Sequence, residues 1–117
     1  MSREEKDLQT IVYYCKRIES YIDRHGDSED NFLDDEEFQE GCAFCLVQIG
    51  EATARLSEDF KELTRYIDWN SIKGLRNILV HRYGSVWLVG IWQTITEEVP
   101  VLKDLCLSLL KSLEEKE

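Results

Sequence analysis

Apolar residues recur every three or four positions through almost the whole chain, and this period constrains the fold more than any other feature. One such stripe consists of Leu8, Ile11, Val12, Cys15, Ile18 and Ile22. Spacings of three and four place side chains on one face of an α-helix. No stretch alternates with period two for long, and the chain has one proline and six glycines. The sequence therefore predicts an all-α fold.

The first helix is expected over about residues 4–24. The polar, turn-rich segment HGDSEDNFLDD that follows is expected to be a loop. A second helix is expected over about residues 35–56. Its apolar stripe consists of Phe38, Cys42, Cys45, Leu46, Ile49 and Ala52.

A short helix is expected after Ser57, which is a suitable N-cap, with Phe60 and Leu63 pointing inward. A third long helix then begins near residue 70, with Asn70 or Ser71 as its N-cap. Its expected buried positions are Ile72, Leu75, Ile78 and Leu79.

Gly84 is expected to end this third helix, and Ser85 to begin the next one. The inward positions of that next helix are Trp87, Leu88, Ile91, Trp92 and Ile95. Pro100 suits the first turn of a final helix. That helix carries Leu102, Leu105, Cys106, Leu109 and Leu113. The chain is thus predicted to form one domain over residues 1–117, an up-and-down bundle of four to five helices.

The four cysteines raise the question of a metal or redox site. Cys42 and Cys45 have the CxxC spacing of a zinc half-site, but no second pair exists in the sequence. Cys15 and Cys106 occupy apolar positions of their own helices. Buried, reduced thiols are therefore expected, and a metal or redox role is the alternative.

The N-terminal sequence MSREEKDLQT has no apolar core of a secretory signal. No stretch approaches the roughly 18 apolar residues that a membrane-spanning helix needs. We therefore expect a cytoplasmic protein without a membrane partner.

The formal net charge of −10 disfavours general binding to nucleic acids, because phosphate contacts supply most non-specific affinity. The charge is unevenly distributed, however. Residues 1–60 contain 6 basic and 16 acidic groups, whereas residues 61–92 contain 5 basic and 2 acidic groups. This local excess of three positive charges coincides with the segment RNILVHRYG, residues 76–84.

Four polar side chains in this segment frame an apolar centre. On a helix with about 100° per residue, Asn77 and His81 form an i, i+4 pair, and Arg76 and Tyr83 lie one above the other two turns apart. All four occupy the arc opposite or beside the predicted core. Val80 lies among them, which would make sense if a partner subunit packs there.

These side-chain types suit one reaction. A histidine that titrates near neutral pH can remove a proton from a ribose 2′-hydroxyl, and an arginine can bind a phosphate and stabilise the charge that develops on it. Arginine and histidine without a carboxylate cluster favour RNA cleavage without a metal. On spacing alone, an arginine and a histidine on the exposed face of a helix are usually just solvated, and Tyr83 would simply cover the helix end.

The segment resembles a known family. Arg76, His81 and Tyr83 match the R-x4-H-x-Y signature of the HEPN superfamily, and in particular of HepT-like toxins, and the polar Asn77 after the arginine also fits. Three flanking blocks are similar in order and spacing: FCLVQIGEATARLSEDF (44–60), DWNSIKGLRNILVHRYG (68–84) and VWLVGIWQTITEEVPVL (86–102). The likeness covers about four fifths of the chain and is weakest over residues 1–35.

The resemblance implies a homodimer in which two R-x4-H motifs face each other and cleave RNA, with no cofactor and no metal. The expected catalytic residues are Arg76, Asn77 and His81, and the expected additional RNA contacts are Lys73 and Arg82. Arg82 stands where related sequences often have Asp or a small residue.

The resemblance also implies a toxin of a prokaryotic two-gene system. Its partner would be an MntA-like minimal nucleotidyltransferase, an antitoxin that attaches AMP to the motif tyrosine, here Tyr83. The alternative is a helical dimer without catalytic activity that binds and regulates a nucleotidyltransferase, which the acidic composition favours.

Overall fold

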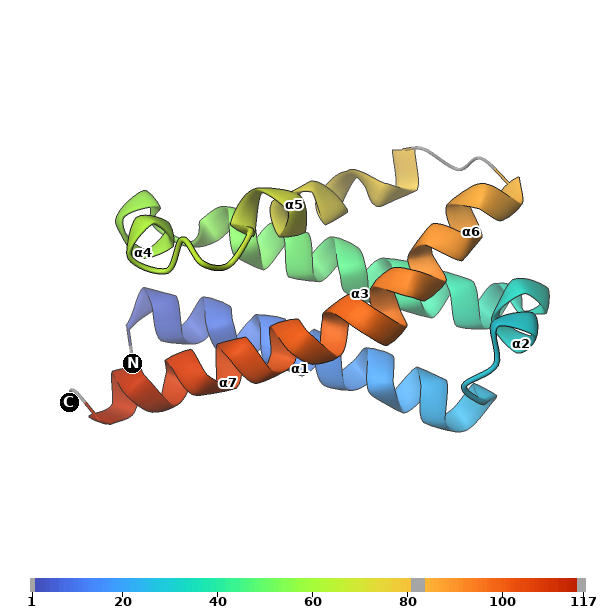
Figure 1. The fold of residues 1–117 in the computed structure, drawn as a ribbon, viewed down its shortest axis with the longest axis horizontal. Helices are drawn as coiled ribbons and strands as arrows, with labels where there is room; N and C mark the ends of the chain where they lie inside the picture. Colours follow the sequence, from blue (N-terminus) through green and yellow to red (C-terminus); the bar gives the residue numbers. More distant parts are fainter. Residues whose placement is uncertain (1, 81–83, 116–117) are drawn as a thin grey trace.

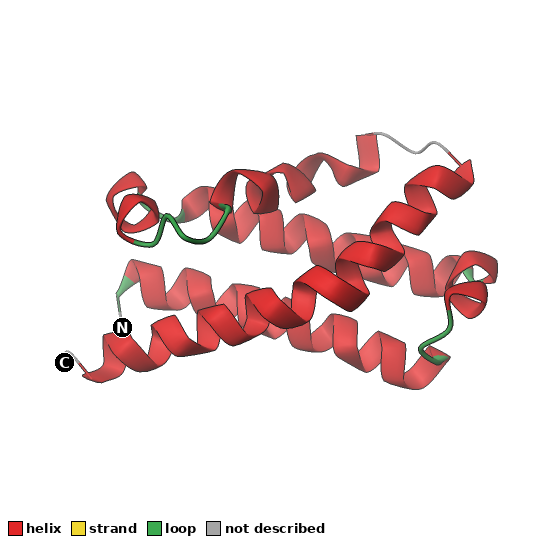
Figure 2. Ribbon diagram, in the orientation of Figure 1, coloured by secondary structure: helices red, strands yellow, loops and turns green. Residues whose placement is uncertain are grey.

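The computed structural model describes the backbone of residues 2–80 and 84–115 and the side chains of residues 2–79 and 87–115. Every element within these ranges is a helix (Figures 1 and 2). The elements are α1 (Arg3–His25), α2 (Glu29–Asp34), α3 (Glu36–Arg55), α4 (Glu58–Leu63), α5 (Trp69–Lys73), the 3₁₀-helix η1 (Gly74–Val80), α6 (Gly84–Gln93), the π-helix η2 (Thr94–Glu98) and α7 (Val99–Glu115). The predicted all-α bundle is confirmed.

The long helices run lengthwise through a molecule of 46 × 26 × 20 Å. Helix α3 lies between α1 and the α5–η1 rod, and α1 and α3 are antiparallel (Figure 1). The rod formed by α6, η2 and α7 crosses the face of this layer and returns the C-terminus to the end where α1 begins (Figure 1). This arrangement places η1 and α1 on opposite sides of α3.

The predicted apolar stripes of the first two long helices form the centre of the core. On α1, five of the six predicted positions are buried and Ile22 is partly buried, and all six predicted positions of α3 are fully buried. Further buried residues come from the turn before α5, from α5 itself and from the α6–η2–α7 rod: Ile67, Trp69, Ile91, Trp92, Ile95, Val99, Leu102 and Cys106.

All four cysteines are buried and free, so the prediction of reduced core thiols is confirmed. Burial raises the pKa of Cys42 and Cys106 to about 12, and burial also raises the pKa of Cys15. In the described part of the chain, no group of three or more His, Cys, Asp or Glu side chains could hold a metal ion.

The segment after α1 is not the predicted loop, because it contains α2. The Ser28 hydroxyl accepts a hydrogen bond from the Asn31 backbone N–H at 3.3 Å and caps the helix. Phe32 is fully buried, and its ring contacts those of Phe38 and Trp92 at centroid distances of 4.9 and 5.4 Å. A single buried phenylalanine thus anchors a short helix that its polar neighbours conceal in the sequence.

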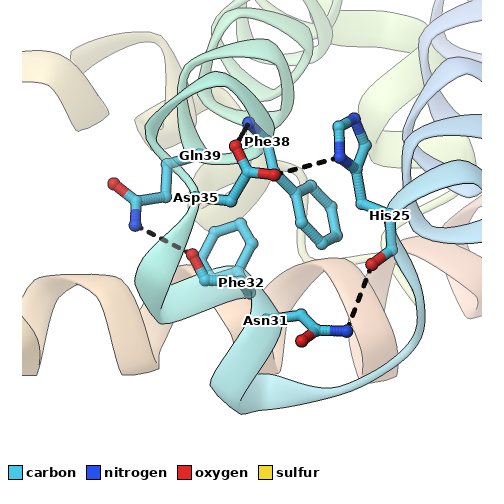
Figure 3. A network of polar contacts seen from close by, with 6 residues as sticks. All are labelled: His25, Asn31, Phe32, Asp35, Phe38 and Gln39. Atoms are coloured by element: carbon cyan, nitrogen blue, oxygen red, sulfur yellow. Dashed lines mark hydrogen bonds and ion pairs between the residues drawn. The ribbon is translucent and has the colours of Figure 1, made fainter.

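A polar network closes the corner between α1 and α3 (Figure 3). His25 Nδ1 lies 3.1 Å from an Asp35 carboxylate oxygen, and the other oxygen accepts from the Phe38 backbone N–H at 3.1 Å. The Asn31 amide donates to the His25 carbonyl at 3.3 Å, and the Gln39 amide donates to two carbonyls of α2. The His25 ring also stacks on Phe38 at 4.9 Å. His25 therefore has a structural role at this corner.

The short helix α4 is only partly as predicted. Ser57 caps it by accepting from the Phe60 backbone N–H at 3.2 Å, and Phe60 packs on the core. Leu63, however, is 82% exposed, so its predicted inward position is wrong. The helix ends at Leu63, and the next residue, Thr64, turns inward and accepts a 2.9 Å hydrogen bond from the Trp69 indole.

The last rod contains the predicted final helix with Pro100 in its first turn. Ile91, Trp92 and Ile95 are buried as predicted, and Trp87 and Leu88 are partly buried. The Val99 N–H bonds to the Thr94 carbonyl, five residues earlier. Proline lacks an N–H and crowds the carbonyl four residues before it, and this wider π turn accommodates both effects. No helix in the described ranges is long and apolar enough to cross a membrane.

Candidate functional site

The beginning of the R-x4-H segment lies on η1, which directly follows α5. Here the structure differs from the predicted long helix. Asp68, rather than Asn70 or Ser71, caps α5: its carboxylate accepts from the Ser71 backbone N–H at 3.2 Å and the Ser71 hydroxyl at 2.7 Å. These two hydrogen bonds, the hydroxyl one first, lower the pKa of Asp68. The α-helix stops after five residues and continues as the 3₁₀-helix η1. Gly84 begins α6, so it does not end this helix as predicted.

The change to a 3₁₀-helix alters which residues share a face. With three residues per turn, side chains at i and i+3 lie above one another. Leu75 and Ile78 accordingly pack on the core together with Ile72, whereas Leu79 is 40% exposed and follows Arg76 by one turn. The predicted burial of Leu79 is wrong because the prediction assumed α-helical steps of about 100°.

The polar side chains of η1 are available for binding. Arg76 and Asn77 are both exposed, in the orientation that the sequence predicts, and Lys73 at the end of α5 is half-buried. Within the described residues, no carboxylate forms an ion pair with Arg76 or Lys73. A guanidinium that no internal carboxylate neutralises can bind an external phosphate.

Gly50 permits a close contact between α3 and the backbone of Arg76, and this glycine was not among the predicted site residues. A Cβ atom added to Gly50 would lie 3.0 Å from the Cα and 3.1 Å from the Cβ of Arg76, and closer still to its backbone nitrogen. Helix α3 and η1 therefore approach each other more closely here than a side chain allows. The sequence did contain a signal for this contact, namely a glycine in the middle of a predicted helix. Glycine destabilises a helix interior, so its presence there indicates a close contact with another element.

The other motif residues, His81, Arg82 and Tyr83, lie outside the described residues, as does the side chain of Val80. The predicted i, i+4 and i, i+7 pairings with Asn77 and Arg76 therefore stay predictions. The two sides of this segment are joined, because the Trp87 indole of α6 donates a 3.0 Å hydrogen bond to the Ile78 carbonyl of η1.

A groove of about 470 Å³ lies beside this connection, between α3, η1 and α6. Its lining consists of Glu36, Gln39, Glu40, Ala43, Phe44, Leu79, Trp87 and Leu88. Phe44 is 53% exposed, and its ring meets the edge of Tyr14 at a centroid distance of 6.1 Å. The groove combines the exposed ring of Phe44 and the partly buried ring of Trp87 with two carboxylates, so it suits a protein surface better than a phosphate chain.

Comparison with known proteins gives consistent results. Residues 11–109 match the ribonuclease HepT-like family. The chain is 36% identical over 104 residues to the "Probable ribonuclease HepT" of Thermococcus cleftensis, covering 88% of this chain and 93% of the relative. It is 29% identical over 118 residues to a "Putative RNase" of Methanocaldococcus jannaschii, covering 96% and 98%.

A "Putative RNase" of Caldanaerobacter subterraneus is 32% identical over 107 residues, covering 92% of this chain and 90% of the relative. No solved structure matches the chain. The match extends from within α1 to within α7 and contains η1 and the whole R-x4-H-x-Y segment. The chain belongs to the ribonuclease HepT-like family.

Proposed function

We propose that this protein is the toxin of a prokaryotic toxin–antitoxin system and acts as an endoribonuclease without a metal ion. The observation that carries the proposal is Arg76: it is exposed, has no carboxylate partner among the described residues, and stands five positions before His81 in a chain of the HepT-like family. The relatives whose names specify an RNase support RNA as the substrate.

The proposed reaction uses the RNA's own 2′-hydroxyl as the nucleophile. His81 accepts its proton while the 2′ oxygen forms a bond to the adjacent phosphorus. The bond from phosphorus to the 5′ oxygen breaks, leaving a 2′,3′-cyclic phosphate and a 5′-hydroxyl that takes a proton from its surroundings. Arg76 binds the phosphate and stabilises its added negative charge, and Asn77 orients the reacting groups.

A homodimer is part of the proposal, with the R-x4-H motifs of two copies facing each other. The exposed apolar groove containing Phe44 and Leu79 adjoins η1 and supports a protein contact near the motif. Lys73 and Arg82 would then contact neighbouring phosphates of the bound RNA.

The catalytic proposal is tested with purified protein, freed of any partner, and RNA in the presence of EDTA. We expect cleavage that leaves 2′,3′-cyclic phosphate ends. Arg76→Ala and His81→Ala should each reduce the rate by about 10²–10⁴-fold, the usual effect of removing a transition-state donor or a general base. Lys111→Ala, which removes an exposed cation of α7, is the control and should leave the rate unchanged. Identical RNA products from wild type and His81→Ala would contradict the proposal.

Regulation by a nucleotidyltransferase is the second part of the proposal. An MntA-like partner would use ATP to attach AMP to the Tyr83 hydroxyl, adding bulk and negative charge beside Arg76 and His81 and so blocking the site. Intact mass spectrometry after incubation with such a partner and ATP should show an AMP-sized increment on wild type and none on Tyr83→Phe. Absence of the increment on wild type would remove this part while leaving the cleavage test unaffected.

One observation favours a second candidate, a dimer without catalytic activity that regulates the nucleotidyltransferase. The groove beside η1 has the exposed ring of Phe44 and the carboxylates of Glu36 and Glu40, and these carboxylates repel RNA. Cell toxicity that survives the combined loss of Arg76 and His81 would fit only this candidate.

A further inference from the structure

On helix α1 the basic and the acidic residues lie on different sides of the helix, which the order of the residues along the chain does not reveal. It contains five basic and five acidic residues, and His25 near its end. At about 100° per residue, the basic residues all fall within an arc of about 140°, and the acidic residues all fall outside it. The helix therefore has one face without carboxylates in a chain whose net charge is −10.

We define the α1 basic face by the residues within about 80° at one side of this arc: Arg3, Lys6, Thr10, Tyr13, Arg17, Tyr21 and Arg24. All four of its cations are exposed, and Tyr13 is 52% exposed. The face extends over about 32 Å, at 1.5 Å per residue. It is a continuous strip along the whole helix.

Tyrosines alternate with the arginines and orient them. The Arg17 guanidinium lies 5.8 Å from the Tyr13 ring centroid and donates to its phenol oxygen at 3.3 Å. The Arg24 guanidinium lies 5.0 Å from the Tyr21 ring centroid. Ring contacts hold these guanidinium groups without neutralising them, so their charge remains available to an external anion.

The packing of the bundle leaves this face open. Helix α7 contacts the opposite side of α1, where Lys103 Nζ lies 2.8 Å from the Glu19 carboxylate. Helix α3 borders the face at Gly41, where an added Cβ would lie 2.6 Å from Cε1 of the Tyr21 ring. Asp7, which lies about 40° beyond Arg3 around the helix, is buried and paired with Arg55 at 3.1 Å. In the part of the chain that the structure describes, the four cations of the face are exposed and none forms an ion pair with a carboxylate.

From this arrangement we infer that the α1 basic face binds the backbone of single-stranded RNA outside the cleavage site, with its arginines and Lys6 on phosphates and its exposed tyrosine against a base. A line of cations with interleaved aromatic rings is the usual surface for single-stranded nucleic acid. The inference rests on the proposed ribonuclease function for its choice of RNA. It explains how a strongly acidic chain can bind a polyanion, because the α1 strip adds a local attraction to that of the cations around Arg76.

The test measures binding of the full-length protein to a 2′-O-methyl oligonucleotide, which keeps the phosphates but cannot be cleaved through a 2′-hydroxyl. The variant is Arg17→Gln with Arg24→Gln. The matched control is Arg65→Gln with Lys111→Gln, which removes the same charge from exposed positions elsewhere. Each phosphate contact contributes about 0.7 to the salt slope of single-stranded binding, so losing two should lower the slope by about 1.4.

The same contacts predict about 25-fold weaker binding of the Arg17/Arg24 variant at 0.1 M salt and little difference at 1 M salt. The Arg65/Lys111 control should bind like wild type. Cleavage of a dinucleotide, which spans only the reacting phosphate, should be unchanged in both variants, because neither touches the proposed catalytic residues.

Equal binding and equal salt slopes for wild type and the Arg17/Arg24 variant would overturn the inference. So would a change in sedimentation of that variant without RNA, because the face would then be a contact between copies of the chain. Failure of the ribonuclease proposal looks different: the oligonucleotide binds through α1, but no RNA is cut.

Discussion

Glycine residues show how single positions control the candidate site. Gly50 permits the close contact of α3 with the backbone of Arg76, and Gly41 permits a close contact of α3 with the end of the Tyr21 ring. The two contacts differ in which atoms must move if a methyl group is added to the glycine. A tyrosine ring can rotate away, whereas a backbone nitrogen moves only if η1 moves.

We therefore predict that Gly50→Ala displaces η1 and lowers the rate of RNA cleavage, together with a loss of about 1–3 kcal/mol in unfolding free energy from overpacking. Gly41→Ala, on the same helix, should leave cleavage of a dinucleotide unchanged, because so short a substrate does not reach the α1 basic face that Tyr21 belongs to. Gly90→Ala, where an added Cβ meets nothing within 4 Å, should stabilise the protein by up to about 1 kcal/mol. Urea unfolding and cleavage rates check all three. Full activity of Gly50→Ala would show that Arg76 does not depend on this contact.

At the scale of elements, the α5–η1 rod departs most from its sequence pattern. Its apolar residues fit an α-helical stripe, and an α-helix would bury Leu75 and Leu79 together. In the structure, Leu75 packs on the core and Leu79 is 40% exposed, because side chains of the 3₁₀-helix η1 repeat every three residues. The same helix lies close to α3 at Gly50.

The two leucines provide a direct test of this twist. Leu75→Ala should lower the unfolding free energy by about 2 kcal/mol, the lower end of the range for buried leucines, whereas Leu79→Ala should lower it by less than about 1 kcal/mol. Urea unfolding at low protein concentration measures both. Equal losses that are independent of concentration would contradict the 3₁₀ register. A loss for Leu79→Ala that grows with protein concentration would instead place Leu79 in the proposed dimer contact.

At the scale of the whole molecule, the core contains four cysteine thiols, which come from α1, α3 and α7. Cys15, Cys42, Cys45 and Cys106 all have fully buried side chains, and burial raises their pKa values, to about 12 for Cys42 and Cys106. A raised pKa favours the neutral thiol in the folded state. Stability is therefore independent of these groups below about pH 9 and falls above it, where only the unfolded chain loses the protons.

We predict that the folded protein resists alkylation at pH 8. A pKa raised from 9.0 to about 12 reduces the thiolate fraction about a thousandfold, and burial adds a barrier to access. Counting modified cysteines by mass spectrometry should give rapid reaction of all four in urea and very slow reaction without it. Rapid reaction of Cys42 or Cys45 in the folded protein would restore a redox role for the CxxC pair.

The sequence by itself determined the all-α class, the stripes of α1 and α3, the buried thiols and the exposure of Arg76 and Asn77. The first three features follow from periodicity, because a stripe at helical spacing has only one way to be buried. Arg76 and Asn77 are exposed as predicted, although η1 is a 3₁₀-helix and not the predicted α-helix. Tertiary structure decided the rest. Helix α2 is anchored because Phe32 packs against Phe38 and Trp92, and η1 lies close to α3 because Gly50 has no side chain. The open basic face of α1 likewise depends on which side α7 covers. Such outcomes depend on contacts between residues far apart in the chain, which local spacing does not encode.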